Sequence, residues 1–172
     1  MHDTHHSSPG DAAAQAALAH LRTTCRSAVL ASVNPDGSPD ASYAPVAESD
    51  LDDGAFLIVV SELARHTGNL VRTRRVSALL IEDEASAGQI FARRRATFEC
   101  RIEIVERGSA AWRRGFETLE ARHGAAVKML RELSDFQLLR LVPERGTLVL
   151  GFGRAWRLSG PRCDALEAIG PP

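Results

Sequence analysis

The chain has 172 residues, of which 44% are hydrophobic and 25% are charged, with a formal net charge of -1 and a pI of about 6.6. This length supports one sizeable hydrophobic core, and the balanced charge argues against a nucleic-acid-binding protein held by a basic surface. The three cysteines lack metal-binding spacing, and no apolar run reaches the roughly 20 residues that span a bilayer. We expect a single-domain cytoplasmic protein with free thiols, no membrane segment and no metal site.

The first part of the chain predicts a helix followed by a β-hairpin. Residues 1–12 are polar, and we expect a flexible N-terminal head there. Residues 11–24 are rich in alanine and carry leucines on one face, which is typical of a helix. Residues 27–33 have strand character, the segment Asn-Pro-Asp-Gly at 34–37 predicts a tight turn, and residues 40–47 return as the partner strand.

The middle of the chain alternates between strands and one helix. An apolar strand is expected at 55–60, a helix at about 63–72 and a further strand at 76–81. Polar and apolar residues then alternate from 90 to 105, which predicts one long, bent strand.

The last third predicts two helices, at 109–123 and 125–133, followed by strands at 136–142 and 146–152 that flank a Pro-Glu-Arg-Gly turn. Six or seven strands joined mostly by short turns indicate an α+β fold built on a small antiparallel barrel with flanking helices. We expect this domain to occupy residues 13–158, and a C-terminal tail to follow at 159–172.

Polar side chains gather where the strand at 55–60 gives way to the next helix. They are Ser61, Arg65, His66, Thr67 and Asn69. A helix N-terminus presents free N–H groups and the positive end of a dipole, so these side chains suit a phosphate or carboxylate. The alternative is structural, with Ser61 capping the helix, His66 on the surface and Asn69 bonded to a nearby loop.

Two other segments suggest ligand contacts. Ser42, Tyr43 and Ala44 lie on a strand of small residues that would let a flat ring approach the backbone, although packing against a helix is the alternative. Arg93 and Arg95 are expected on one face of the strand at 90–105, where two guanidinium groups can bind an anion. These arginines could instead protect a sheet edge or pair with the acidic residues at 82–84.

Five motifs in this order resemble the pyridoxamine 5'-phosphate oxidase-related split-barrel family, in particular its haem-utilisation branch. The motifs are Ala-Ser-Tyr-Ala-Pro, Ser-x-Leu-x-x-His-Thr-x-Asn-Leu, Ser-x-Leu-x-x-Glu-Asp-Glu, Phe-Ala-Arg-x-Arg and Gly-Phe-Gly. The resemblance covers about residues 15–158. It implies a six- to seven-stranded antiparallel split β-barrel that forms a homodimer, with two equivalent ligand sites in the cleft between the subunits.

The resemblance also implies an FMN-binding flavoprotein, an oxidoreductase acting on a small-molecule substrate. The strand at 42–45 would line the flavin ring, and the segment at 61–69 would hold the phosphate. Arg93 and Arg95 would lie beside the phosphate. The cofactor-binding residues expected on all these grounds are Ser42, Tyr43, Ala44, Ser61, Arg65, His66, Thr67, Asn69, Arg93 and Arg95. A catalytic acid or base is not evident.

The alternative implied by the same resemblance is a haem-binding or haem-degrading protein for iron utilisation. Haem-degrading members carry an axial histidine near the C-terminus, whereas the last histidine of this chain is His123. Asp135 matches an acidic position that supports the haem ligand in some relatives. A third alternative is a barrel whose cleft has lost its cofactor.

Overall fold

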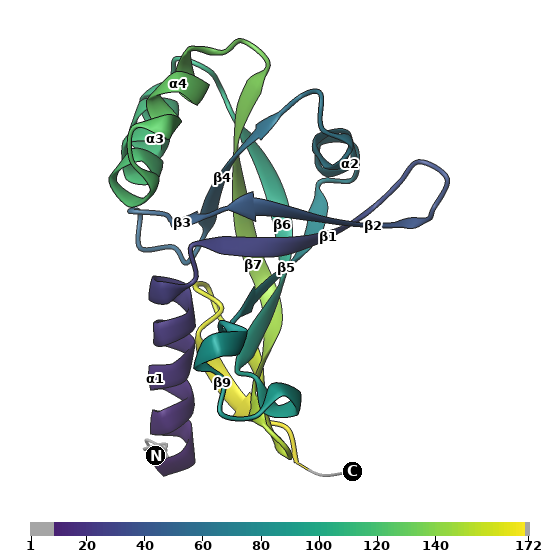
Figure 1. Ribbon diagram of the computed structural model, residues 1–172, viewed down its shortest axis with the longest axis vertical. Helices are drawn as coiled ribbons and strands as arrows, with labels where there is room; N and C mark the ends of the chain where they lie inside the picture. The colour runs from purple at the N-terminus through teal and green to yellow at the C-terminus, as the bar shows by residue number, and fades with distance from the viewer. Residues whose placement is uncertain (1–8, 171–172) are drawn as a thin grey trace, which may run out of the picture.

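The computed structural model describes residues 9–170, which form one antiparallel sheet with helices packed around it (Figure 1). Within these residues the sheet has nine strands, in the order β2-β1-β5-β6-β7-β4-β3, and β8 and β9 extend from β7. The strands are β1 (Ser27–Val33), β2 (Pro39–Pro45), β3 (Ala47–Glu48), β4 (Phe56–Ser61), β5 (Arg75–Ile81), β6 (Arg95–Val105), β7 (Phe136–Gly151), β8 (Arg154–Ser159) and β9 (Ala165–Ala168). The predicted antiparallel α+β split-barrel class is confirmed, with more strands than expected.

Four α-helices flank the sheet in the described part of the chain. They are α1 (Pro9–Thr24), α2 (Arg65–Thr73), α3 (Ala110–His123) and α4 (Ala126–Glu132), and two short 3₁₀ helices, η1 (Glu84–Ser86) and η2 (Ile90–Ala92), follow β5. Figure 1 shows α1 beside the lower half of the sheet, α3 and α4 together near the upper end, and α2 next to the β1–β2 hairpin. None of the helices within residues 9–170 is long and apolar enough to cross a membrane.

The main core lies inside the curled sheet and is sealed by α1. On β1, Ala28 and Leu30 are buried while the residues between them are exposed, because successive strand residues point to opposite faces. Leu18 and Leu21 of α1 pack into the same cluster, together with Phe98 of β6. Each fully buried leucine stabilises the fold by roughly 1.5–3 kcal/mol.

A second, smaller cluster holds α3 against the upper end of the sheet. Ser109 precedes the helix, and its Oγ accepts a hydrogen bond of 3.1 Å from the backbone N–H of Trp112. Trp112, Phe116 and Leu119 recur at helical spacing and pack with Leu138 of β7. The predicted helix and its amphipathic face are therefore confirmed.

The two strands predicted at 136–142 and 146–152 are a single strand, β7, so the expected turn between them is wrong. The register with β6 shifts here, because Cys100 pairs with Pro143 whereas Glu99 pairs with Arg145. Glu144 is thus an extra residue in a β-bulge. Pro143 has no backbone N–H to donate. Because the pairing is irregular at a bulge, no hydrogen bond from this position is required, and the strand continues through the proline.

The strand predicted at 90–105 begins only at Arg95, after η2. Arg93 therefore does not lie on the strand, and its Nε donates to the backbone oxygen of Glu82 at 3.1 Å. The expectation that Arg93 and Arg95 share one face of a strand is wrong for this reason.

The segment expected to be a C-terminal tail contains β9, which pairs with β8. The turn before β9 packs closely on the loop between β3 and β4, because a Cβ atom added to Gly54 would lie 2.4 Å from the backbone oxygen of Arg162. At the other end, residues 9–12 of the expected head belong to α1, and residues 1–8 lie outside the described part.

We predict that Gly54→Ala destabilises the protein by about 2 kcal/mol or more. Gly54 has a φ of +70°, which L-residues rarely adopt, and the added methyl group would collide with a backbone atom of the C-terminal turn. Urea unfolding followed by circular dichroism measures the change. Gly88→Ala is the matched control, since a Cβ atom there meets nothing within 4 Å. Equal unfolding midpoints for the two variants would contradict the close packing of this turn.

Candidate functional site

The loop between β4 and α2 is fixed by side-chain hydrogen bonds. Ser61 donates from Oγ to Asp135 Oδ2 at 2.8 Å, and its backbone oxygen accepts a hydrogen bond of 2.6 Å from Thr67 Oγ1. The N-cap position of α2 is Ala64, which provides no side-chain cap. Ser61 therefore does not cap the helix, and the hydroxyl groups of Ser61 and Thr67 are both engaged within the loop.

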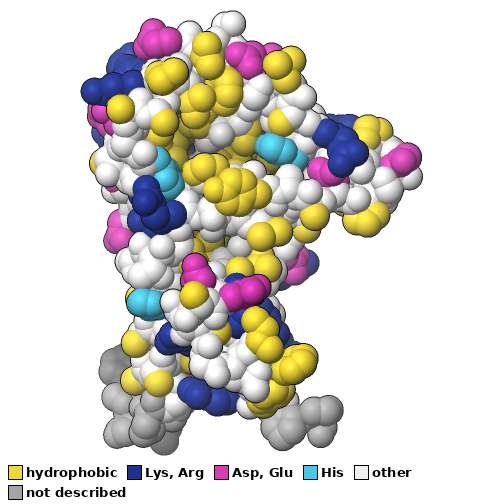
Figure 2. Space-filling model, in the orientation of Figure 1, with side chains coloured by type: hydrophobic (Ala, Val, Ile, Leu, Met, Phe, Trp, Pro, Cys, Tyr) yellow, Lys and Arg dark blue, Asp and Glu magenta, His cyan; other side chains and the backbone are white. Residues whose placement is uncertain are grey.

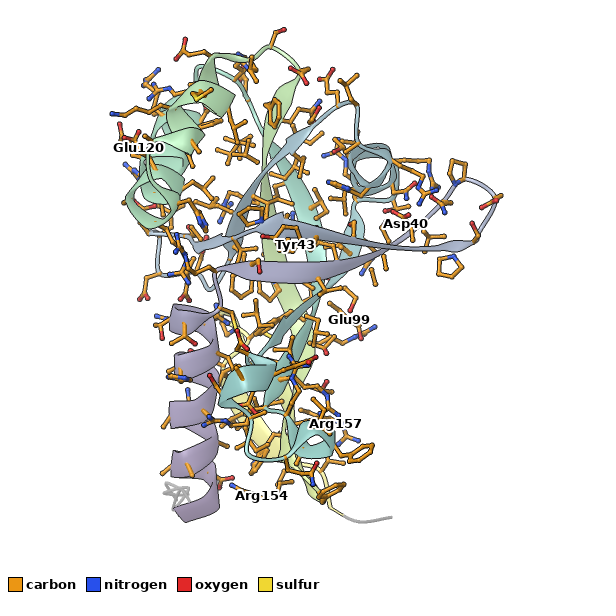
Figure 3. The ribbon with its side chains drawn as sticks, viewed as in Figure 1. Asp40, Tyr43, Glu99, Glu120, Arg154 and Arg157 are labelled. Carbon is orange, nitrogen blue, oxygen red and sulfur yellow. The ribbon has the colours of Figure 1, made fainter. Side chains whose placement is uncertain are left out.

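A buried polar junction attaches α2 to the β1–β2 hairpin. The Asp40 side chain is only 4% exposed, and its Oδ1 lies 2.6 Å from Nη2 of Arg65, whose own side chain is 74% exposed. From the next turn of α2, Asn69 Nδ2 donates to Asn34 Oδ1 at 2.9 Å and to Ser32 Oγ at 3.1 Å. Asn69 thus bonds to the neighbouring turn, as the structural alternative expected. Figure 3 shows Asp40 on β2 directly beside α2.

His66 follows Arg65 in the first turn of α2 and is half-buried. Its ring makes no hydrogen bond to another residue of the described part of the chain. Burial lowers the pKa of His66 below its ordinary value, and the nearby negative charge of Asp40 opposes this shift. The shift favours the neutral form of the ring.

The strand that was expected to meet a flat ring presents mainly Tyr43 to the surface. Ala44 is buried in the core, Ser42 is half-buried, and Tyr43 is 63% exposed and points out from the middle of β2 (Figure 3). Val29 of β1 lies directly opposite Tyr43 in the register and is 42% exposed.

The outer face of the β1–β2 hairpin is apolar. Its members are the outward-facing residues of the two strands, Val29, Ala31, Val33, Pro39, Ala41, Tyr43 and Pro45. Figure 2 shows hydrophobic side chains gathered over the middle of this region. We call these residues the hairpin face. Beside it, a groove of about 610 Å³ includes Ala31 and Val33 and continues over Ser77 of β5 and Glu99 of β6.

Arg93 and Arg95 lie far from the α2 cluster within one chain. The helix α2 precedes β5, whereas these arginines sit beside the loop that follows β5, and seven strand residues span roughly 20 Å. Arg93 Nη1 contacts Glu84 Oε1 at 2.8 Å, and Arg95 Nη1 donates to the backbone oxygen of Arg93 at 3.0 Å. The expected pairing with the acidic segment at 82–84 is confirmed, and a single chain does not bring all ten expected residues together.

Sequence reasoning overlooked the structural centre of the site, which is Asp40 with Ser32. Asp40 begins the motif Asp-Ala-Ser-Tyr-Ala-Pro, and the alternation of β2 places it on the inner face together with Ala44. An inward-facing carboxylate requires a partner. The alternation of inward- and outward-facing residues on β2 was therefore the signal in the sequence. It points to an ion pair between the buried Asp40 carboxylate and a neighbouring cation.

The chain belongs to the pyridoxamine 5'-phosphate oxidase family, whose model matches residues 14–150. Among its relatives is the haem oxygenase HutZ of Vibrio cholerae, which is 42% identical over 131 residues, or 76% of this chain and 73% of the relative.

Two solved structures show the same fold. The crystal structure of HutZ from Vibrio cholerae, described there as a haem storage protein, has a TM-score of 0.71 with 36% identity, over 78% of this chain and 92% of that one. The structure of Campylobacter jejuni ChuZ has a TM-score of 0.82 with 24% identity, over 96% of this chain and 65% of that one.

The expectation of an FMN-dependent oxidoreductase is wrong. The relative that is 42% identical to this chain over 131 residues is named a haem oxygenase, and the crystal structure of HutZ is described as that of a haem storage protein. The family includes flavin-binding proteins, but the likeness of this chain is to the haem-utilisation branch.

We predict that the burial of His66 makes the protein less stable as the pH falls from about 7 to about 5. The folded state has the lower pKa, so the unfolded state binds more protons in this window. The free energy of unfolding therefore decreases on acidification through the unfolded pKa, near 6.5. This loss of stability is absent at higher pH, where the His66 side chain is uncharged in both the folded and the unfolded protein.

Urea unfolding of the wild type and of His66→Gln across this pH range isolates the contribution, because glutamine does not titrate. We expect the wild type to lose more stability than the variant. Parallel pH profiles would show that the imidazole is not desolvated.

Proposed function

We propose that the protein binds haem and acts in haem utilisation. The observation that carries this proposal is the 42% identity to the haem oxygenase HutZ, which extends over 76% of the chain. The structural likeness to HutZ, with a TM-score of 0.71, supports it.

The residues of the candidate site suit haem, which is a flat apolar macrocycle with two carboxylates. The hairpin face offers an apolar surface that includes Tyr43, and the groove beside it is within the usual range of ligand-site volumes. Arg65 remains largely exposed although it pairs with Asp40, so its remaining N–H groups can bind a carboxylate. His66 follows Arg65 on α2, and its partial burial favours the uncharged imidazole.

We further propose that the hairpin face is buried against a second copy of the chain, so that haem lies between two subunits. No other described segment covers Val29 or Tyr43, and exposed apolar surface of this kind commonly marks an interface. An antiparallel pair of identical faces satisfies the self-complementarity that a twofold dimer requires.

Titration of the purified protein with ferric haem tests the proposed function. We expect a Soret band that saturates at a fixed ratio of one haem per chain, with micromolar or tighter affinity, or about -8 kcal/mol or better. FMN titrated in parallel should produce no saturable change in the flavin spectrum. Haem absorption that rises without saturation would contradict a specific site.

The dimer is tested by placing a charge on the hairpin face. We expect Val29→Glu to convert a dimer, with twice the 18.6 kDa mass of the chain, into a monomer, because a desolvated carboxylate costs several kcal/mol. Light scattering coupled to size-exclusion chromatography gives the mass. Met129→Glu, at an exposed position on α4, is the control and should remain dimeric. A monomeric wild type would contradict the proposed dimer. If both variants remained dimeric, the interface would lie elsewhere on the chain.

A further inference from the structure

The groove beside the hairpin face has two charged residues in its lining. Ala31 and Val33 line it on β1, and the charged residues are Arg75 of β5 and Glu99 of β6, which Figure 3 shows just below the β1–β2 hairpin. Glu99 is engaged, because its Oε2 accepts a hydrogen bond of 2.8 Å from Arg145 Nε. This hydrogen bond lowers the pKa of Glu99, and the charge of Arg75 adds a smaller effect. Arg75 is therefore the charged lining residue that can still bind a ligand.

Most of the hydrogen-bonding capacity of the Arg75 side chain is unused. Its Nη1 contacts Glu144 Oε2 at 3.0 Å, whereas Nε and Nη2 make no hydrogen bond to another residue of the described chain. The side chain is 67% exposed. A guanidinium group is always charged and presents its N–H groups in a planar fork that matches a carboxylate. Arg75 can therefore bind a carboxylate without breaking its contact with Glu144.

The β-bulge in β7 holds Arg75 at this position. Arg75 lies directly opposite Arg101 in the register of β5 and β6, and like charges in such a pair repel. The extra residue of the bulge is Glu144, whose carboxylate lies 3.0 Å from Arg75 and 3.8 Å from Arg101. One carboxylate thus contacts both guanidinium groups. Bulges commonly redirect a side chain next to a functional site, and this bulge places a carboxylate that fixes Arg75 at the groove.

A second arginine reaches the same end of the groove from α2. Arg72 Nη2 donates a hydrogen bond to the backbone oxygen of Val33, which lines the groove. Arg72 forms no ion pair with a carboxylate among residues 9–170, so its charge is not neutralised by a neighbour. In the register of β1 and β5, Ala31 faces Ser77, and this pairing brings Val33 to the level of Arg75. The two arginines therefore converge on one end of the groove.

We infer that the groove holds the haem, with Arg75 and Arg72 binding its two carboxylates. This inference rests on the proposed function and extends it to the recognition of the ligand. The groove of about 610 Å³, with apolar residues along it, suits the macrocycle. Two guanidinium groups at one end match the two carboxylates, which haem carries on one edge of its ring.

Arg65 is the other arginine that could bind a carboxylate of haem. It lies roughly 10 Å from Arg72 along the axis of α2, because the helix rises about 1.5 Å per residue. It is absent from the lining of the groove, and its guanidinium group already pairs with Asp40. The inference therefore requires Arg75 to contribute more to haem affinity than Arg65 does.

The test compares ferric haem with haem dimethyl ester, in which both carboxylates are esterified, as ligands of the full chain in the same dilute detergent. We expect the wild type to bind haem at least about tenfold more tightly than the ester, because hydrogen bonds between charged groups are strong. Arg75→Gln and Arg72→Gln should each weaken haem binding by about tenfold and leave the binding of the ester unchanged. A purely structural role of these arginines would weaken the binding of both ligands equally.

Three further variants make the assignment specific. Arg113→Gln, at an exposed position on α3, is the matched control and should bind both ligands as the wild type does. Ser77→Trp fills the groove, so it should weaken the binding of haem and of the ester alike. Circular dichroism confirms that each variant is folded. If Arg75→Gln is not folded, Arg75→Lys replaces it, because lysine keeps the charge but lacks the planar fork, and the preference for haem should fall.

The outcomes separate this inference from the proposed function. A wild type that binds no haem defeats the proposed function itself. A wild type that binds haem stoichiometrically but shows no preference over the ester, or keeps the full preference in Arg75→Gln and Arg72→Gln, overturns only the role of these arginines. Unchanged haem affinity in Ser77→Trp, or loss of the preference in Arg65→Gln alone, places the haem elsewhere and likewise overturns the inference.

Discussion

The burial of one carboxylate governs the arrangement of the candidate site. Asp40 faces the interior of the barrel on β2, and its charge is compensated by Arg65, which reaches over it from α2. Removing one partner of a buried ion pair leaves an uncompensated charge, so the pair constrains where the helix can lie. Asn69 adds a second attachment one turn further on. The orientation of His66 and the exposure of Arg65 both depend on this junction.

The fold was largely predictable wherever the pattern of side chains was local. The hairpin around Gly37 was found from its turn residues, and α3 from the apolar residues at helical spacing. Prediction failed at Pro143, where a proline and a glycine mimic a turn although the strand passes through a bulge. Bulges are determined by pairing with a distant strand, and no local pattern reveals that pairing. The same holds for β9, whose partner β8 accounts for its formation.

The ligand was not predicted correctly, for a physical reason. The residues that carried the family resemblance serve mainly to build the junction: Ser61 binds Asp135 and Asn69 binds Asn34. Such residues specify how the helix meets the barrel, and the fold itself is shared with solved structures described as a haem storage protein and as an FMN-binding protein. A guanidinium group binds a phosphate and a propionate by the same charge-assisted hydrogen bonds. The polar pattern alone therefore could not distinguish FMN from haem.

The state of His66 illustrates how partial burial of a titratable side chain can oppose stability. A fully exposed histidine is partly protonated near pH 7, and a histidine paired with a carboxylate is protonated even more readily. Partial burial without a hydrogen-bond partner lowers the pKa instead, and it weakens the fold on acidification. Asp40 raises the pKa of the ring, but the effect of burial is larger and lowers it overall. Burial thus favours an uncharged imidazole next to the Asp40–Arg65 ion pair.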